Sequence, residues 1–372
     1  MQTAIPCLLM RGGTSRGPFF LEADLPSDVE SRDRVLLAAL GSPDRRQIDG
    51  LGGANPLTSK VGIVRRGTGP GVDLDFLFAQ VMVDKAVVDT TPNCGNMLAA
   101  VVPFAIEAGL ITPQGDTTTL RVLTLNTGMQ CDVTVQTPGG RVEYEGDARI
   151  DGVPGTAAPI AINFLDTAGS VCAGLLPTGR VLDRVDVQGD GFEPFSIDVT
   201  CIDNGMPLVM MKASDLGRTG DESVADLNAD TELKVRVEAL RLKAAQAMGL
   251  GDVTSKTYPK MCLIAPPRAG GSIATRCYIP HVCHDAIGVL AAVTVGTACV
   301  LKGSVAEGVA AVPPGQVKPI SVEHPTGEFT VELAVDSADP QKVTRAALVR
   351  TARLLMRGEV MVPSVVFERK IA

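Results

Sequence analysis

Short runs of apolar residues, separated by Gly, Pro, Asn and Asp, recur along most of the chain. Runs of this length between turn-forming residues are typical of strands. We expect strands at 3–10, 17–22, 58–66, 72–83, 119–126, 131–137, 141–146, 195–203, 207–213, 261–266, 273–279 and 329–335. Because few segments have helical length, the pattern predicts an α+β fold that is rich in strands.

The helical segments are of two kinds. Apolar residues spaced three and four apart predict amphipathic helices at 33–39, 231–249 and 339–356. Segments 97–110 and 286–301 are apolar on nearly every side, so each must be enclosed by protein. Each follows a short polar stretch, 93–96 and 283–285. We therefore expect a weak internal repeat, in which each half of the chain wraps a sheet around one central helix.

The length of the chain predicts two lobes. At 372 residues it exceeds what one hydrophobic core usually organises. The segment 152–179 is rich in Gly, Pro and Ala, which is typical of a crossover between lobes. We expect an N-terminal lobe at 1–178 and a C-terminal lobe at 179–354, with the tail 355–372 as a candidate to return to the first lobe.

Composition excludes several classes of function. The net charge is −8 and no block of Lys and Arg is present, so the electrostatic footprint of a nucleic-acid-binding protein is missing. The N-terminus does not resemble a secretory signal, and the longest uncharged stretch, 286–301, is shorter than the roughly 20 residues of a membrane span. Nine scattered cysteines do not form a disulfide framework. These features favour a cytoplasmic enzyme.

Cys94 lies between Asn93 and Gly95, directly before an apolar helix. The start of a helix is its electropositive end, which favours a thiolate, and the backbone N–H groups of Gly95 and Asn96 can receive a carboxylate. The alternative is a buried structural cysteine, which is a frequent role for this residue type.

Two turn-rich segments offer further polar groups. The loop 49–59 is rich in glycine and ends at Lys60, which opens a strand. It resembles a substrate cradle, although a hairpin loop with a solvated lysine is the alternative. The segment 11–17 offers Thr14, Ser15 and backbone amides to an anion.

The segment 273–290 concentrates polar and sulfur-containing side chains. Arg276 can form a forked pair with a carboxylate, and His284 is a candidate for the wall of a ligand pocket. Zinc is the alternative, with Cys277, His281, Cys283 and His284 as ligands, but their spacing fits no closed zinc-finger pattern. We therefore expect no metal.

Seven motifs together resemble the 2-methylaconitate cis-trans isomerase family, a group within the diaminopimelate-epimerase-like isomerases. They are LMRGGTSRGPFF, QIDGLGGANPLTSKVGIV, NCGNMLAAVVPFAIEAGL, NTGMQ, YEGDARIDGVPGTAAPI, CIDNGMPLV and IATRCYIPHVCHDAIGVL. They occur in the family's order from residue 6 to about residue 297. Segments 41–60 and 273–290 are most similar to 4-oxalomesaconate tautomerases, which act in the breakdown of aromatic acids.

The resemblance implies two pseudo-symmetric epimerase-like lobes, each a curved and mostly antiparallel sheet around a central helix, with the site where the two helix N-termini face each other. It implies Lys60 and Cys94 as catalytic residues. The residues expected to bind substrate are Arg11, Thr14, Ser15, Asn93, Gly95, Asn96, Asn204, Arg276, His284 and Asp285. True epimerases carry a second cysteine where this chain has His284 and Asp285, which disfavours a two-thiol racemase.

The implied activity is a cofactor-independent allylic proton shift in a small unsaturated di- or tricarboxylate, most closely 4-oxalomesaconate. Isomerases of 2-methylaconitate, methylitaconate and aconitate are the near alternatives. An amino-acid racemase or epimerase, a zinc enzyme and a non-catalytic carboxylate-binding protein are the more distant ones. The sequence leaves a homodimer open.

Overall fold

The computed structural model describes residues 1–165, 167–338 and 343–367. The chain divides into two compact units, and each is considered by itself. Unit 1 comprises Met1–Leu165 and Arg350–Ala372, and unit 2 comprises Asp166–Val349. The unit limits thus fall at 165/166 and 349/350, whereas the lobes expected from the sequence have their limits at 178/179 and 354/355.

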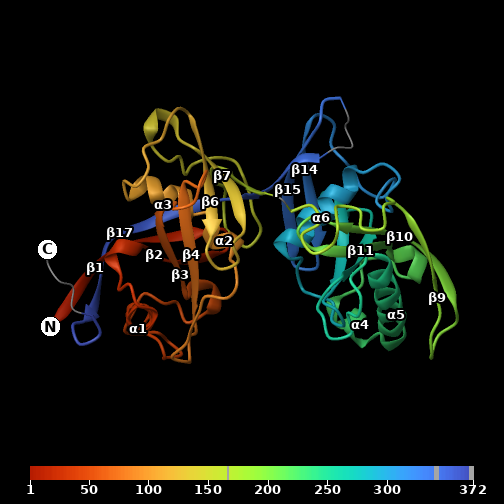
Figure 1. The fold of residues 1–372 in the computed structure, drawn as a ribbon, viewed down its shortest axis with the longest axis horizontal. Coiled ribbons are helices and arrows are strands. Elements are labelled where there is room, and N and C mark those ends of the chain that lie inside the picture. The colour runs from red at the N-terminus through yellow and green to blue at the C-terminus, as the bar shows by residue number, and fades with distance from the viewer. Residues whose placement is uncertain (166, 339–342, 368–372) are drawn as a thin grey trace. The chain divides into compact units, whose positions relative to one another are not determined.

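Unit 1 is built on a mixed sheet (Figure 1). Its strands are β1 (Gln2–Gly12), β2 (Ser15–Leu21), β3 (Lys60–Arg66), β4 (Leu74–Val81), β5 (Val88–Asp89), β6 (Thr117–Thr124), β7 (Gln130–Gln136), β8 (Ile160–Phe164) and β17 (Ala352–Pro363). Its α-helices are α1 (Val29–Leu40), α2 (Gly95–Leu98) and α3 (Val101–Glu107). The strands pair in the order β17-β1-β2-β3-β4-β6-β7-β8, parallel at β2–β3 and β4–β6 and antiparallel elsewhere.

Unit 2 has its own mixed sheet. Its strands are β9 (Asp183–Val187), β10 (Phe195–Asp203), β11 (Pro207–Lys212), β12 (Lys260–Ala265), β13 (Ile273–Tyr278), β14 (Val317–His324), β15 (Gly327–Val335) and β16 (Val343–Arg350). Its α-helices are α4 (Val224–Ala229), α5 (Thr231–Ala247) and α6 (Val289–Val300). The strands pair in numerical order, parallel at β11–β12 and β13–β14 and antiparallel elsewhere.

Helices cover both faces of the unit 1 sheet. Ile63 on β3 packs in one buried cluster with Leu36 of α1. The neighbouring Gly62 lies under the ring of Phe19, whose centroid is 5.5 Å from that of Phe104 on α3. Because side chains alternate along a strand, α1 covers one face and the α2–α3 segment covers the other.

The same alternation divides the core of unit 2. Leu208 and Met210 on β11 pack with α6 residues, whereas Val209 and Met211 pack with α5 residues. From Ala291 to Cys299, every residue of α6 is buried. This confirms that the second apolar segment is an enclosed helix.

The two apolar helices differ in detail from the prediction. Segment 97–110 forms two short helices, because Pro103 has no N–H to donate to the carbonyl of Ala99 and the backbone bonds of Ala99 and Ala100 span only three residues. The second helix begins at Val289, not at residue 286, with Gly288 as its N-cap. The ring of His284 accepts the N–H of Ala286, a local bond that competes with the first helical turn.

Two other predicted elements are wrong, and several observed strands were not predicted. Segment 141–146 is irregular, and the helix expected at 339–356 is replaced by β16 and the first part of β17; residues 339–342 lie outside the described residues. Antiparallel pairing of β17 with β1 from Gln2 to Gly12 outweighs the helical spacing of its apolar residues. Strands β5, β8, β9, β14, β16 and β17 were not expected.

Within the described residues, no helix combines the length and apolar character required to span a membrane.

Candidate active site

Lys60 is the first residue of β3 and is half-buried. It lies two residues before Gly62, so its side chain is on the sheet face that α2 and α3 cover. Its Nζ is 5.1 Å from the centroid of the Phe78 ring, within range of a cation–π contact. A Cβ on Gly17 of β2 would lie 1.6 Å from the Lys60 carbonyl oxygen. Only glycine therefore allows β2 to approach Lys60 this closely.

Cys94 is the N-cap residue of α2 and is also half-buried. The Nζ of Lys60 donates a hydrogen bond to the Cys94 Sγ at 3.4 Å. The two residues are 34 positions apart, and the structure brings together the two side chains that the sequence predicted as catalytic.

The turn between β1 and β2 is packed against the start of α2. The Asn96 Nδ2 donates to Thr14 Oγ1 at 2.9 Å. A Cβ on Gly12 would lie 2.3 Å from the Asn96 carbonyl oxygen. Gly13 has a φ of +50°, and a Cβ there would lie 2.1 Å from Asn96 Oδ1. The consecutive glycines are therefore required for this close contact.

Ser15 has an unusual environment. It is 1% exposed, and its hydroxyl has no hydrogen-bond partner among the described residues. Ser15, Gly17 and Phe19 alternate along β2, so Ser15 shares the face of Lys60 and of the α2–α3 segment. Buried hydroxyls are normally hydrogen-bonded, so this one is available to a ligand.

Two further predicted residues lie on either side of Cys94. Gly95 is the first residue of α2 and keeps its N–H at the open end of the helix. Asn93 is exposed, and its Nδ2 donates to Thr127 Oγ1 at 2.5 Å.

Arg11 lies elsewhere in unit 1. Its neighbour Gly12 faces α2, so Arg11 points to the opposite face of the sheet from Lys60. Its Nη1 donates to the carbonyl oxygens of Gly13 and Thr351 and to Thr351 Oγ1.

The predicted residues of unit 2 are largely engaged within that unit. Asn204 is buried; its Oδ1 accepts from Thr167 Oγ1 at 2.6 Å, and its Nδ2 donates to Thr297 Oγ1 at 2.8 Å. Arg276 donates to the carbonyl oxygens of Glu222 and Thr275. These side chains join elements of unit 2 to one another.

His284 and Asp285 are exposed and precede α6 by several residues. The other residues of the zinc alternative diverge. The Cys277 Sγ is 3.2 Å from the Cys262 Sγ inside the core, and His281 lies 3.4 Å from Glu238 at the surface. No group of three or more His, Cys, Asp or Glu side chains suited to a metal ion occurs at 1–165, 167–338 or 343–367.

Sequence reasoning missed Lys260. It opens β12 as Lys60 opens β3, and a Cβ on Gly288, the N-cap of α6, would lie 3.6 Å from its Nζ. Burial lowers the pKa of Lys260. The available signal was a lysine opening a strand directly after Pro259, at the start of an apolar run.

Most other cysteines have a raised pKa, which disfavours the reactive thiolate form. Burial raises the pKa to about 12 at Cys131, Cys172, Cys201, Cys283 and Cys299, and to about 11 at Cys7. The hydrogen bond with Cys277, and then burial, raise the pKa of Cys262. Only Cys94 and Cys172 are half-exposed. Cys94 is therefore the thiol with the best combination of access and environment for reaction.

We expect iodoacetamide at neutral pH to alkylate Cys94 before any other cysteine of the native protein. Peptide mass spectrometry after short exposures measures the order of modification, and the same protein in denaturant provides the control in which all nine thiols react. Equal or faster modification of Cys172 would contradict this reading of the two half-exposed thiols.

Comparison with known proteins agrees with the resemblance of the motifs. A family model described as PrpF protein matches residues 2–363. A (4E)-oxalomesaconate Delta-isomerase from Novosphingobium sp. is 55% identical over 357 residues, covering 96% of this chain and 97% of the relative. A 4-oxalomesaconate tautomerase from Pseudomonas putida is 52% identical over 361 residues, covering 97% of each.

A solved structure titled methylitaconate-delta-isomerase has a TM-score of 0.85 and 34% identity, and the match covers 99% of this chain and 98% of that chain. The fold and these relatives define the chain as an isomerase. It belongs to the PrpF protein family, which confirms the family resemblance of the sequence.

Proposed function

We propose that this isomerase catalyses an allylic proton shift in an unsaturated di- or tricarboxylate, with 4-oxalomesaconate as the substrate, in its keto–enol or double-bond isomers. The observation that carries the proposal is the 3.4 Å contact between Lys60 Nζ and Cys94 Sγ. Two relatives that are more than half identical to this chain and are named for oxalomesaconate support the choice of substrate.

The two side chains are the proton-transfer groups of the proposed reaction. One removes a proton from the allylic carbon, and the C–H electron pair enters the conjugated system as a dienolate. A proton is then added at the other end of that system, so the double bond changes position and no electrons are gained or lost overall. The N···S distance permits direct proton exchange between Lys60 and Cys94.

Donors for the dienolate and the carboxylates come from the same face of unit 1. The Ser15 hydroxyl is buried without a hydrogen-bond partner. The N–H groups of Gly95 and Asn96 lie in the first turn of α2. Donors fixed before the reaction stabilise the charge that develops in the transition state, and removal of one typically costs about 10²–10³ in rate. Thr14 holds Asn96 in place.

We also propose that the two units are pseudo-symmetric epimerase-like lobes. Support comes from strand directions: β1-β2-β3-β4-β6-β7-β8 and β10-β11-β12-β13-β14-β15-β16 follow the same succession of antiparallel and parallel pairs. In this correspondence β3 matches β12, so Lys60 and Lys260 occupy equivalent positions. The α2–α3 segment and α6 each lie in the chain between the two strands of the second parallel pair, β4 and β6 in unit 1 and β13 and β14 in unit 2.

A panel of candidate substrates tests the proposed function. We expect turnover of 4-oxalomesaconate with a kcat/KM at least tenfold above those for 2-methylaconitate, methylitaconate and aconitate, measured by ultraviolet absorbance and NMR. Preference for another member of the panel would overturn the substrate assignment, but the proposed allylic proton shift would still hold. Tight binding without turnover of any of the four would favour a carboxylate-binding protein.

A further inference from the structure

Three arginines lie side by side across three neighbouring strands of unit 1. Arg11 on β1 is directly opposite Arg16 on β2 and directly opposite Arg353 on β17. Residues in direct register place their side chains on the same face, with Cβ atoms about 5 Å apart. Like charges in such positions destabilise a sheet unless an anion compensates them.

No carboxylate among the described residues forms an ion pair with any of the three arginines. The Arg16 Nε is buried without a hydrogen-bond partner. The Arg353 side chain is exposed, and its guanidinium group forms no hydrogen bond with another described residue. Burial, and then the charge of Arg353, lower the pKa of Arg11, which agrees with two guanidinium groups close together without a counter-ion.

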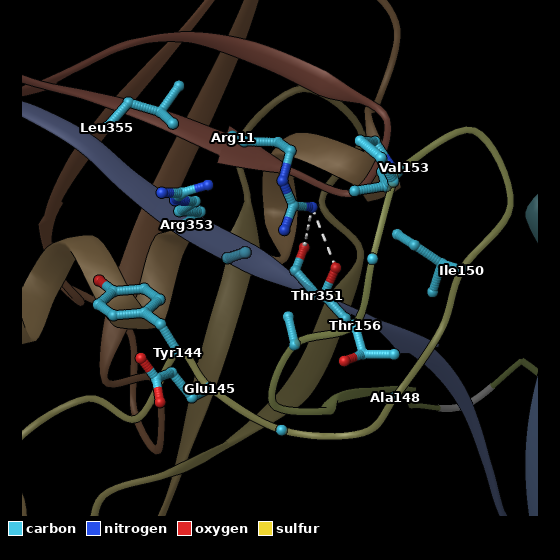
Figure 2. Close-up of a pocket in the computed structure, with 15 residues that line it drawn as sticks. Arg11, Tyr144, Glu145, Ala148, Ile150, Val153, Thr156, Thr351, Arg353 and Leu355 are labelled. Carbon is cyan, nitrogen blue, oxygen red and sulfur yellow. Dashed lines mark hydrogen bonds between the residues drawn. The ribbon is translucent and has the colours of Figure 1, made fainter.

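A cavity of about 680 Å³ opens beside this row. Arg11 and Arg353 line it together with Thr351, Thr156 and Tyr144, and Glu145 is the one carboxylate of its lining (Figure 2). The volume lies within the range of small-molecule sites. Lys60 and Cys94 are not among the lining residues, and Arg11 points away from their face of the sheet.

We propose that this cavity is a second anion site, which binds a small polycarboxylate through Arg11 and Arg353. The planar guanidinium groups pair with carboxylates in the bidentate manner, and the hydroxyls of Thr156 and Thr351 supply neutral donors. Arg16 adds positive charge from the next strand. The site is separate from the one proposed for catalysis and does not depend on the identity of the substrate.

Isothermal titration of the full chain with citrate, a tricarboxylate, tests the proposal. We expect Arg353→Gln to weaken citrate binding about tenfold to a hundredfold, as the loss of a charged hydrogen-bonding partner requires. Arg353→Lys keeps the positive charge but not the forked guanidinium group, so its affinity for citrate should lie between those of the wild type and Arg353→Gln. Arg66→Gln, which alters an exposed arginine at the end of β3, is the matched control and should bind citrate as the wild type does.

Three comparisons distinguish this site from the catalytic one. Lys60→Ala should retain the Arg353-dependent citrate binding, and Arg353→Gln should keep its kcat and KM within about twofold of the wild type. Citrate binding that is lost in Lys60→Ala but unchanged in Arg353→Gln would overturn the proposal, as would the absence of citrate binding. Arg353-dependent binding of inorganic phosphate without citrate would overturn the polycarboxylate assignment.

Discussion

Lys60→Ala is expected to lower kcat for isomerisation by about 10²–10⁴, the usual contribution of a positioned general acid or base. Lys60 is the proposed proton-transfer group, its Nζ donates to the Cys94 Sγ, and no other described side chain donates to that sulfur. Steady-state kinetics measures the loss. Circular dichroism and thermal unfolding should show an intact fold, since the backbone of residue 60 still pairs with Gln80 on β4.

Two further variants show whether the loss reflects proton transfer. Lys60→Arg keeps the positive charge and the contact with Phe78, but a guanidinium remains protonated and cannot act as a base. It should therefore be nearly as inactive as Lys60→Ala. Lys85→Ala changes an exposed lysine between β4 and β5 and should leave kcat unchanged. Activity of Lys60→Arg close to that of the wild type would reduce the role of Lys60 to electrostatics.

Cys94→Ser is expected to lower kcat by about 10²–10³, with a smaller change in KM. A serine hydroxyl fits the position but exchanges a proton with carbon or with Lys60 much less readily than a thiol does. The measurement is a progress curve at saturating substrate.

The matched control is Cys172→Ser, which alters the other half-exposed cysteine and belongs to unit 2. It should turn over at the wild-type rate. Equal effects of the two substitutions would indicate a general sensitivity to loss of a thiol, and a fully active Cys94→Ser would remove Cys94 from the mechanism.

Local patterns predicted much of the fold because its strands are short and bounded by strong turn residues. β10 was predicted at its observed limits, and α5 within two residues of its end. Errors arose where distant pairing decided the outcome. The apolar residues of 343–356 have a helical spacing, but β16 pairs with β15, and β17, which begins at Ala352, pairs with β1, more than 300 residues earlier. Pro103 was a visible signal for the interruption between α2 and α3.

The sequence predicted some residues of the candidate site well and others poorly. Lys60 and Cys94 belong to distinctive motifs. Because the sequence analysis assigned both residues to one site, it also predicted that they lie close together. The unpartnered hydroxyl of Ser15 depends on burial, which the sequence alone does not reveal. The opposite orientation of Arg11 and Lys60 follows from strand register, which also creates the row of three arginines. Residues assigned together to one site thus separate onto two faces of a sheet.

The most direct test of the central claim is the fate of the allylic hydrogen in deuterated water. With 4-oxalomesaconate and the wild-type protein, we expect NMR and mass spectrometry to show solvent deuterium at the carbon that receives the proton, and none above the uncatalysed background with Lys60→Ala. Product formed at the full enzymatic rate with no deuterium at any carbon would contradict proton transfer through Lys60 and Cys94.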